Sequence, residues 1–178
     1  MKASVLAATL AATSVFGAFP ALAQEESTGF YGNLGYNYVD AGAGFKFSAL
    51  SARAGYRFHQ YFGAEGEAAI GVDDDHITLS GVRVKTELKH SFNGYVVGFL
   101  PVGKNFDLLA RGGYGTTKIK ASALGVSAAG SDESWNYGVG AQYLLDGQNG
   151  VRVDYTRHDF GSGNEDANVW SLAYVRKF

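Results

Sequence analysis

Apolar side chains recur at every second position through eight segments of this 178-residue chain, and this alternation is what most limits its fold. In the first segment Phe30, Leu34 and Tyr38 fall on one face, and Asn33 and Asn37 on the other. A repeat of two residues is typical of β-strands, whose successive side chains point to opposite faces. The eight segments are Phe30–Tyr38, Leu50–Phe58, Phe62–Val72, Val84–Leu100, Phe106–Gly115, Trp135–Leu145, Val151–His158 and Trp170–Phe178. In the fourth, the alternation is blurred because both faces carry apolar residues near Tyr95–Phe99.

The connections between these segments alternate between short and long. The short turns are His59–Tyr61, Pro101–Asn105 and Asp146–Gly150, and the longer links are Asp40–Lys46, Asp73–Arg83, Ile119–Ser134 and Asp159–Asn168. Each strand is about long enough to cross a bilayer when tilted. Short turns on one rim and longer loops on the other are typical of an outer-membrane barrel whose two termini lie in the periplasm.

The first 23 residues form a separate segment. Lys2 is the only charge before Glu25, and the apolar stretch Ala3–Phe19 leads into Ala21-Leu22-Ala23. A basic start, an apolar core and a small-residue cleavage site are typical of a secretory signal peptide. A retained membrane anchor is the alternative, although the stretch is short and contains several hydroxyl side chains. We therefore expect residues 1–23 to be a cleaved signal peptide and residues 24–178 to form one barrel domain.

Composition excludes several classes of protein. The formal net charge is −2 and no long basic run is present, so the electrostatic footprint of a nucleic-acid binder is missing. The chain has no cysteine, which excludes disulfides, thiolate metal sites and a cysteine nucleophile. With 25 glycines and two prolines, the sequence suits an ordered, glycine-spaced β protein.

The content of the polar face separates a membrane barrel from a soluble, lipocalin-like barrel, which would show the same alternation. A face in contact with water should carry scattered lysines and glutamates, but this face is dense in Gly, Ala and Ser. Its charges are Arg53, Arg57, Arg111 and Arg152, and Glu65, Glu67, Asp107 and Asp154. Four charges of each sign among small residues suit a narrow polar lumen, in which each charge must be paired. We predict that these eight residues form an interlocked network that fills the lumen.

The apolar face carries aromatic side chains near strand ends, as expected for girdles at the two membrane interfaces. They include Phe58, Phe62, Phe106, Tyr143 and Trp170. The chain ends in an alternating pattern that resembles the C-terminal signal by which outer-membrane barrels are recognised for assembly. Its members are Trp170, Leu172, Tyr174 and Phe178, while Arg176 replaces the apolar residue usual at its position. We therefore expect the barrel-assembly machinery and periplasmic chaperones to be partners during biogenesis.

Several runs resemble the small porin-like outer-membrane β-barrel proteins, which are related to the opacity proteins and to the transmembrane domain of outer membrane protein A. These runs are Gly29–Tyr38, Ala54–Phe58, Phe62–Glu67, Val153–Phe160 and Tyr174–Phe178. The resemblance covers nearly all of residues 24–178. It implies an all-β fold, an eight-stranded antiparallel up-and-down transmembrane β-barrel in the cell outer membrane. Proteins of this family serve in adhesion, anchoring and envelope integrity, so the resemblance implies location better than activity.

One cluster of polar residues is a candidate catalytic site, because some outer-membrane barrels are lipid-modifying enzymes or proteases. His158, Asp159, Ser162 and Glu165 offer a base, a nucleophile and orienting carboxylates near one strand end. Their spacing does not match the His-x-Ser-Asn pattern associated with lipid A deacylases. We expect no catalysis, and a lipid-modifying hydrolase that uses His158 and Ser162 is an alternative.

Two further groups of polar residues are candidate binding sites, one for divalent ions and one for lipid phosphates. The run Asp73–His76 concentrates oxygen ligands but lacks the glycine and terminal glutamate of a calcium loop, so we expect no metal and no cofactor there, with weak divalent-ion binding as the alternative. If the fourth and fifth segments pair, Arg83 and Lys85 come near Lys118 and Lys120 at the outer rim. Such a rim could bind lipopolysaccharide phosphates, or it could simply be solvated.

The function expected from the sequence is therefore that of an integral outer-membrane barrel. An eight-stranded barrel is just wide enough for its own side chains, which disfavours an open pore. We expect a monomer with a structural, envelope-integrity or surface-interaction role, in contact with outer-membrane lipid. A narrow porin that passes ions or very small solutes is the alternative.

Overall fold

A computed structural model of the chain describes residues 28–42, 46–72, 74–79, 82–123, 126–161 and 166–178. Within these, residues 74–79, 82–88, 119–123 and 126–129 are described by their backbone alone. The predicted signal peptide, residues 1–23, lies outside the described residues. Among the described residues, no helix is long and apolar enough to cross a membrane.

The described residues form nine antiparallel strands. They are β1 (Gly29–Asp40), β2 (Lys46–His59), β3 (Phe62–Gly71), β4 (Asp74–Leu79), β5 (Val82–Pro101), β6 (Phe106–Ala123), β7 (Val126–Leu144), β8 (Asn149–Asp159) and β9 (Ala167–Lys177). Each of the eight predicted segments corresponds to one of these strands, and β4 is additional.

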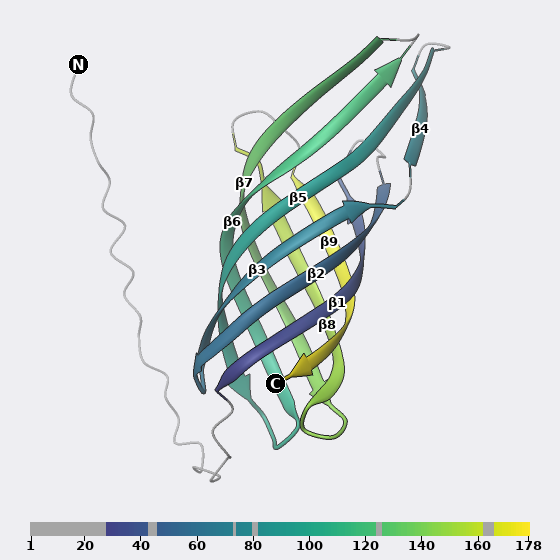
Figure 1. Cartoon of the computed structure of the whole chain (residues 1–178). Coiled ribbons are helices and arrows are strands. Elements are labelled where there is room, and N and C mark those ends of the chain that lie inside the picture. The colour runs from purple at the N-terminus through teal and green to yellow at the C-terminus, as the bar shows by residue number, and fades with distance from the viewer. Residues whose placement is uncertain (1–27, 43–45, 73, 80–81, 124–125, 162–165) are drawn as a thin grey trace, which may run out of the picture.

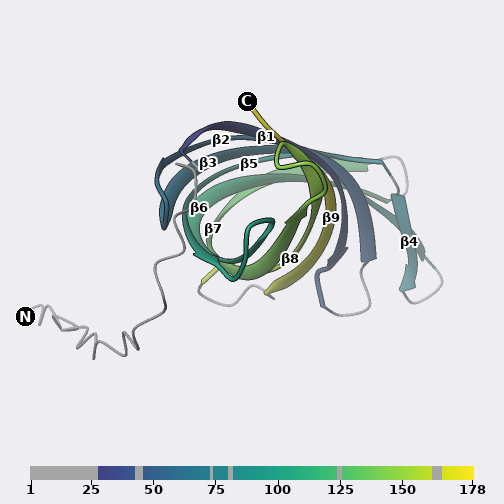
Figure 2. The ribbon, with the colours of Figure 1, turned by 90° about the horizontal axis from the view of Figure 1, so that it is seen from below.

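The sheet closes on itself. Its strand order is β3-β2-β1-β9-β8-β7-β6-β5-β4, and β3 also pairs with β5, from Phe62 opposite Gly98 to Ala69 opposite Ser91. Figure 2 shows the resulting ring, with β4 outside it and paired to the end of β5. The predicted eight-stranded antiparallel barrel is therefore confirmed.

The two faces of the sheet have opposite character. Along β8, Val151 and Val153 are exposed on the outside, while Arg152 and Asp154 are buried inside. Leu34, on the outside of β1, is 67% exposed. A barrel in water would place these apolar side chains in its core, so the observed arrangement is the one that a lipid bilayer requires. The inside-out reading of the alternation is confirmed, and a soluble barrel is excluded.

Outward aromatic side chains form two belts. Those toward the short turns include Phe30, Tyr56, Phe58, Phe62, Phe106, Tyr143, Tyr174 and Phe178, and those toward the long strand ends include Tyr36, Tyr38, Phe92, Tyr114, Trp135, Tyr155 and Trp170. Several hydroxyls in these belts donate hydrogen bonds to polar neighbours, such as Tyr155 to Asn168 Oδ1 at 2.6 Å. Aromatic belts of this kind mark the two membrane interfaces.

Three strands are longer than a bilayer requires. β5, β6 and β7 contain 20, 18 and 19 residues, whereas about 9–11 tilted residues cross the membrane. Figure 1 shows these strands rising beyond the rest of the barrel, at the end opposite the chain's C-terminus.

These long strands correct two predicted loops. Most of the Ile119–Ser134 link is a β-hairpin, because β6 continues to Ala123 and β7 begins at Val126. Likewise, β4 lies within the predicted Asp73–Arg83 loop and pairs with the start of β5. Ala, Ser and Gly give little apolar alternation in the first of these segments, and continued backbone pairing between neighbouring strands forms the ladder without it.

The turn between β7 and β8 shows how the short connections are fixed. The Asp146 carboxylate accepts hydrogen bonds from the backbone N–H groups of Gln148 and Asn149, at 2.9 and 2.5 Å, and from the Asn149 side chain at 2.7 Å. These hydrogen bonds, foremost that from the Asn149 N–H, lower the pKa of Asp146 to about 2. Gly147 has a φ of 81°, a conformation that favours glycine.

Some inward glycines allow neighbouring backbone and side-chain atoms to come closer than a Cβ atom would permit. A Cβ atom on Gly113 would overlap the backbone oxygen of Gly94 and the ring of Tyr95. Its neighbour Gly112 faces outward, and a Cβ there would meet nothing within 4 Å. The two positions therefore differ in what surrounds them although they are adjacent.

Replacing Gly113 by alanine should destabilise the folded barrel by about 1–3 kcal/mol, because the added methyl group has no room. Gly112→Ala is the matched control and should leave stability close to wild type. Urea unfolding in lipid vesicles, followed by the shift in gel mobility between boiled and unboiled samples, measures both. Equal stability of the two variants would contradict the close approach at Gly113.

Candidate functional site

The candidate site is the interior of the barrel. β2, β3, β6 and β8 each direct two of the predicted charges inward, at alternating positions such as Arg152 and Asp154. All eight predicted network residues are buried, and Arg152 has no exposed surface. Alternation and strand tilt thus bring residues that are far apart in the sequence into one narrow space.

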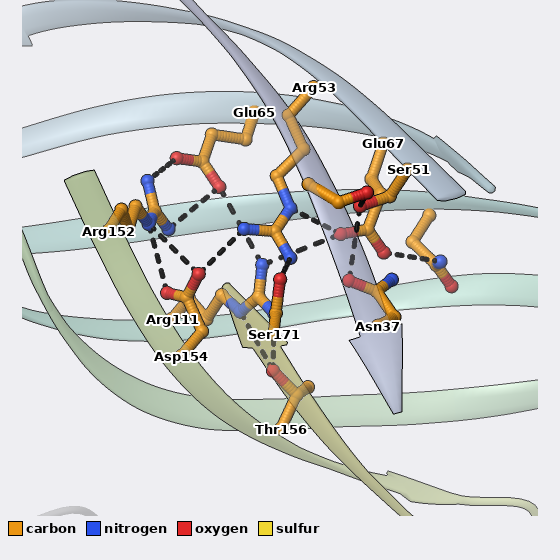
Figure 3. A network of polar contacts seen from close by, with 12 residues as sticks. Asn37, Ser51, Arg53, Glu65, Glu67, Arg111, Arg152, Asp154, Thr156 and Ser171 are labelled. Carbon is orange, nitrogen blue, oxygen red and sulfur yellow. Dashed lines mark hydrogen bonds and ion pairs between the residues drawn. The ribbon is translucent and has the colours of Figure 1, made fainter. Parts of the chain in front are cut away.

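Six of the eight charges form a central network (Figure 3). Arg53 donates through Nε to Glu67 and lies 2.6 Å from Asp154 through Nη1. Arg152 binds Glu65 through Nη1 and Asp154 through Nε, the latter at 2.9 Å. These ion pairs connect β2, β3 and β8, which are not all neighbours in the sheet, so they cross the lumen.

Arg111 is the sixth member and the most loosely held. Its Nη1 lies 3.7 Å from Glu67 Oε2 and 3.9 Å from Glu65 Oε2, beyond hydrogen-bond distance, and this buried nitrogen has no hydrogen-bond partner. Its Nε and Nη2 donate to Thr156 Oγ1, and its guanidinium stacks 4.6 Å from the centre of the Tyr95 ring. Arg111 therefore completes the charge balance of three arginines against three carboxylates, with fewer direct contacts than Arg53 or Arg152.

The remaining two charges form a separate cluster nearer the short turns. Arg57 Nη1 lies 3.2 Å from Asp107 Oδ2, which also accepts a hydrogen bond from Gln142 Nε2 at 2.8 Å. Arg57 also donates to the backbone oxygen of Gln60 through Nε at 3.1 Å. This group, Arg57 with Asp107 and Gln142, is called the turn-side cluster below.

Buried apolar side chains lie between the central network and the turn-side cluster. The apolar layer consists of Tyr31, Tyr95, Val97, Phe99 and Leu109. Along β6, Leu109 is the inward residue between Arg111 of the network and Asp107 of the cluster. The sequence predicts one interlocked group of eight charges, and the structure instead places six in one group and two in another.

Neutral polar residues that the sequence analysis did not single out complete both groups. Tyr31 donates to Glu65 Oε1 at 2.8 Å, and Asn93 donates to Glu67 Oε1 at 3.0 Å. The Ser171 hydroxyl accepts from Arg53 Nη2 at 3.1 Å. The alternation of each strand predicts that these residues point into the lumen. Only the strand register shows which charged residue each one contacts.

The proposed catalytic cluster is not assembled among the described residues. His158 is buried in the lumen opposite Asn136, whereas its neighbour Asp159 lies on the other face of β8 and accepts a hydrogen bond from the Gly161 N–H at 2.9 Å. Adjacent residues of a strand point to opposite faces, so Asp159 cannot orient His158. Ser162 and Glu165 lie outside the described residues.

The acidic run Asp73–His76 also falls largely outside what the structure describes. Asp73 lies outside the described residues, and Asp74–Leu79 is described by its backbone, which forms β4. Among the described side chains, no group of three or more His, Asp or Glu residues could hold a metal ion.

The backbone register brings the four basic rim residues onto neighbouring stretches of β5 and β6. Lys118 pairs with His90, Lys120 with Glu87, and Ser122 with Lys85. A β-bulge between Leu88 and His90 shifts the register by one residue. The bulge therefore changes which residues of β5 lie opposite Lys118 and Lys120 on β6.

The residues of the predicted assembly signal lie on one face of the chain's last strand. Trp170, Leu172, Tyr174 and Phe178 are all exposed on the outside of the barrel. β9 pairs on one side with β1 and on the other with β8, so this face forms part of the lipid-facing belt.

A family model described as an outer membrane protein beta-barrel domain matches residues 8–178. The match begins inside the segment predicted as signal peptide and includes all nine strands. No match was found among curated proteins.

Solved structures of similar fold are outer-membrane barrels of Gram-negative bacteria. OprG of Pseudomonas aeruginosa has a TM-score of 0.66 and 13% identity, with 87% of this chain and 98% of that chain covered. Neisserial surface protein A has a TM-score of 0.64 and 13% identity over 84% and 97% of the two chains. Ail, the attachment invasion locus protein of Yersinia pestis, has a TM-score of 0.60 and 18% identity over 87% and 100%. At these identities the similarity shows the fold.

Removing Arg152 should be far more costly than removing an arginine at the barrel mouth. Arg152→Met leaves Glu65 buried without its main partner, and such a loss destabilises by about 3–5 kcal/mol. Arg157→Met is the matched control, because Arg157 pairs with Asp166 at the same end of the barrel with side chains 40% and 31% exposed, and water screens such a pair so that its loss changes stability little. Urea unfolding in vesicles measures the difference, and similar losses for both variants would contradict the buried network.

Proposed function

We propose that this chain, which belongs to the family of outer membrane protein beta-barrel domains, acts as a closed barrel with a structural and surface-interaction role and without catalysis. It is a β-barrel protein of the Gram-negative outer membrane. The proposal concerns what the barrel does there: it adds a rigid, lipid-embedded wall to the envelope and carries an extended sheet beyond the membrane surface.

The observation that carries the proposal is the filled lumen. The side chains of the six central residues are at most 4% exposed, and they bind each other across the barrel. To open a path, an ion must displace paired charges that have no water to replace their partners, and breaking such a pair costs several kcal/mol. A lumen of this kind suits a structural barrel better than a pore.

The described polar residues also support a role without catalysis. His158 faces the charged network of the lumen, and its neighbouring carboxylate lies on the opposite face of the strand. A hydrolase needs its base, nucleophile and orienting carboxylate within reach of each other and of the substrate. The narrow porin is the main alternative, since a rearranged network could pass very small solutes.

The pure, folded protein should show no steady unitary conductance in planar bilayers, because buried side chains fill the lumen. Detergent without protein and heat-unfolded protein are the controls for leak. Steady single-channel steps that require folded protein would contradict the closed barrel and support the narrow porin.

We also propose that the outer rim binds the phosphates of lipopolysaccharide. Lys118 is exposed and His90 half-buried, and this pair lies two residues beyond the pair of Phe92 and Thr116, at the outer aromatic belt. Cations just outside such a belt stand at the depth of lipid headgroups. Arg83, Lys85 and Lys120 lie farther along β5 and β6, in the part of these strands beyond the outer aromatic belt.

The outward extension of β5, β6 and β7 supports the surface-interaction part of the proposal. These strands continue well past the length needed to cross the membrane, and β4 adds a fourth strand beside them. An ordered sheet that projects from the cell surface offers a larger contact area than short loops would.

Reversing the charge of Lys118 and Lys120 together should weaken stabilisation by lipopolysaccharide. Each basic residue near an anionic lipid surface contributes about 1 kcal/mol, and reversal also adds repulsion. The increase in unfolding temperature between phospholipid vesicles and vesicles that contain lipopolysaccharide measures this effect. Lys104→Glu is the matched control, because Lys104 is exposed in the turn at the opposite rim. An unchanged increase for the Lys118 and Lys120 variant would contradict the lipid site.

A further inference from the structure

The lumen contains an apolar barrier that its charge pattern does not reveal. Tyr31, Tyr95, Val97, Phe99 and Leu109 come from β1, β5 and β6 and are each no more than 5% exposed. In a barrel whose other inward residues are mostly polar or small, five large apolar side chains in mutual contact form a distinct layer. Tyr31 and Phe99 meet edge to face, with ring centres 6.0 Å apart.

The layer lies between the two charged groups along β2 and β6, whereas on β7 Gln142 of the turn-side cluster pairs directly with Arg152 of the central network. Along β2, Gly55 lies between Arg53 of the central network and Arg57 of the turn-side cluster, and the Tyr31 ring occupies the space where a Gly55 side chain would be. Along β6, Leu109 lies between Arg111 and Asp107. On both strands the inward position between the charged groups is therefore covered by an apolar side chain.

On both sides of the apolar layer, its aromatic side chains contact charged residues. On the network side, the Tyr31 hydroxyl binds Glu65, and Arg111 stacks on Tyr95. On the turn side, the Arg57 guanidinium lies 4.2 Å from the centre of the Phe99 ring. The layer thus joins both charged groups through aromatic faces and edges, with hydrocarbon between them.

The polar side next to the layer is incompletely satisfied. Arg111 Nη1 and the Tyr95 hydroxyl are buried without a hydrogen-bond partner, as are both polar atoms of the Asn33 side chain. Buried groups of this kind are usually satisfied by internal water. Water that reaches the central network therefore has polar partners up to the layer, and none within the layer apart from the Tyr95 and Tyr31 hydroxyls at its edge.

From this we propose that the apolar layer, rather than the ion-pair network, is the barrier that stops ions and water in the lumen. This inference rests on the proposed closed barrel and identifies the part of the lumen that blocks ions and water. Charged networks can rearrange and admit water, whereas a narrow apolar constriction excludes ions because it offers nothing to replace their hydration. Loosening the network alone should leave the barrel closed.

The test compares inward and outward substitutions at neighbouring positions in planar bilayers. Phe99→Ala combined with Leu109→Ala truncates two of the five side chains of the layer, and Leu100→Ala with Leu108→Ala makes similar losses on the lipid-facing side of the same strands. We expect the inward double variant to show openings at least about tenfold more often than wild type, in line with the loss of a barrier of a little over 1 kcal/mol. The outward double variant should behave as wild type.

A gentler pair of variants guards against loss of folding. Val97→Thr adds a hydroxyl to the layer at nearly constant volume, and Val96→Thr makes the same change on the outside, where Val96 is 62% exposed. Heat-dependent gel mobility shows that each variant is folded. Asp154→Asn loosens the central network, in which Asp154 binds Arg53 and Arg152, and should remain closed.

Two results would overturn the inference: folded inward variants that stay as closed as wild type, or openings in Asp154→Asn that match those of the inward variants. Steady conductance in the wild type is a different result, because it would contradict the closed barrel itself. The variants therefore test whether the apolar layer is the barrier, and the wild type tests whether the barrel is closed.

Discussion

The hydrocarbon core of a membrane offers no hydrogen-bond partner to a backbone N–H or C=O group, so a sheet can span it only if its two edges meet. In this protein the edges meet where β3 pairs with β5 over eight residue pairs. The rest of the structure follows from that closure. A ring of eight strands leaves a lumen that side chains can fill, and its outer surface must be apolar because lipid surrounds it.

The inner surface has the opposite requirement, since polar groups removed from both water and lipid must satisfy each other. Three arginines and three carboxylates do so in the centre, and Arg53 and Arg152 each bind two carboxylates. Glycines on the inner wall, such as Gly113, make room for the long side chains opposite them. An ion-pair network of this kind does not make the barrel more stable than an apolar core would, but it defines which strands and which register belong together.

Much of this arrangement could be predicted from alternation. The inward positions of Asp107 and Arg111, and the outward positions of Phe106 and Leu108, follow from parity along one strand. The partner of each charge could not be predicted, because Arg53 and Asp154 are 101 residues apart and meet only through strand tilt and register. The β-bulge beside His90 could not be predicted either, since one inserted residue changes the parity of a strand without any signal in composition.

The apolar layer illustrates a subtler limit. Tyr95, Val97 and Phe99 blur the alternation of their strand, and sequence alone does not show that Tyr31 and Leu109 join them from other strands. The charge pattern therefore predicts one network of eight charges that fills the lumen. The structure instead has two charged groups, with the apolar layer between them along β2 and β6. The barrel is closed in either case. The barrier to ions is the charged network in the first case and the apolar layer in the second.

Fluorescence quenching of the two tryptophans tests the inside-out arrangement most directly. Trp135 and Trp170 are the only tryptophans of the chain, and their rings are 68% and 59% exposed on the outer face. In vesicles of lipids with brominated acyl chains, the folded protein should lose much of its emission, and Trp135→Phe and Trp170→Phe should show that each remaining ring is quenched. Unquenched emission from folded protein in these vesicles would contradict an apolar face in contact with lipid.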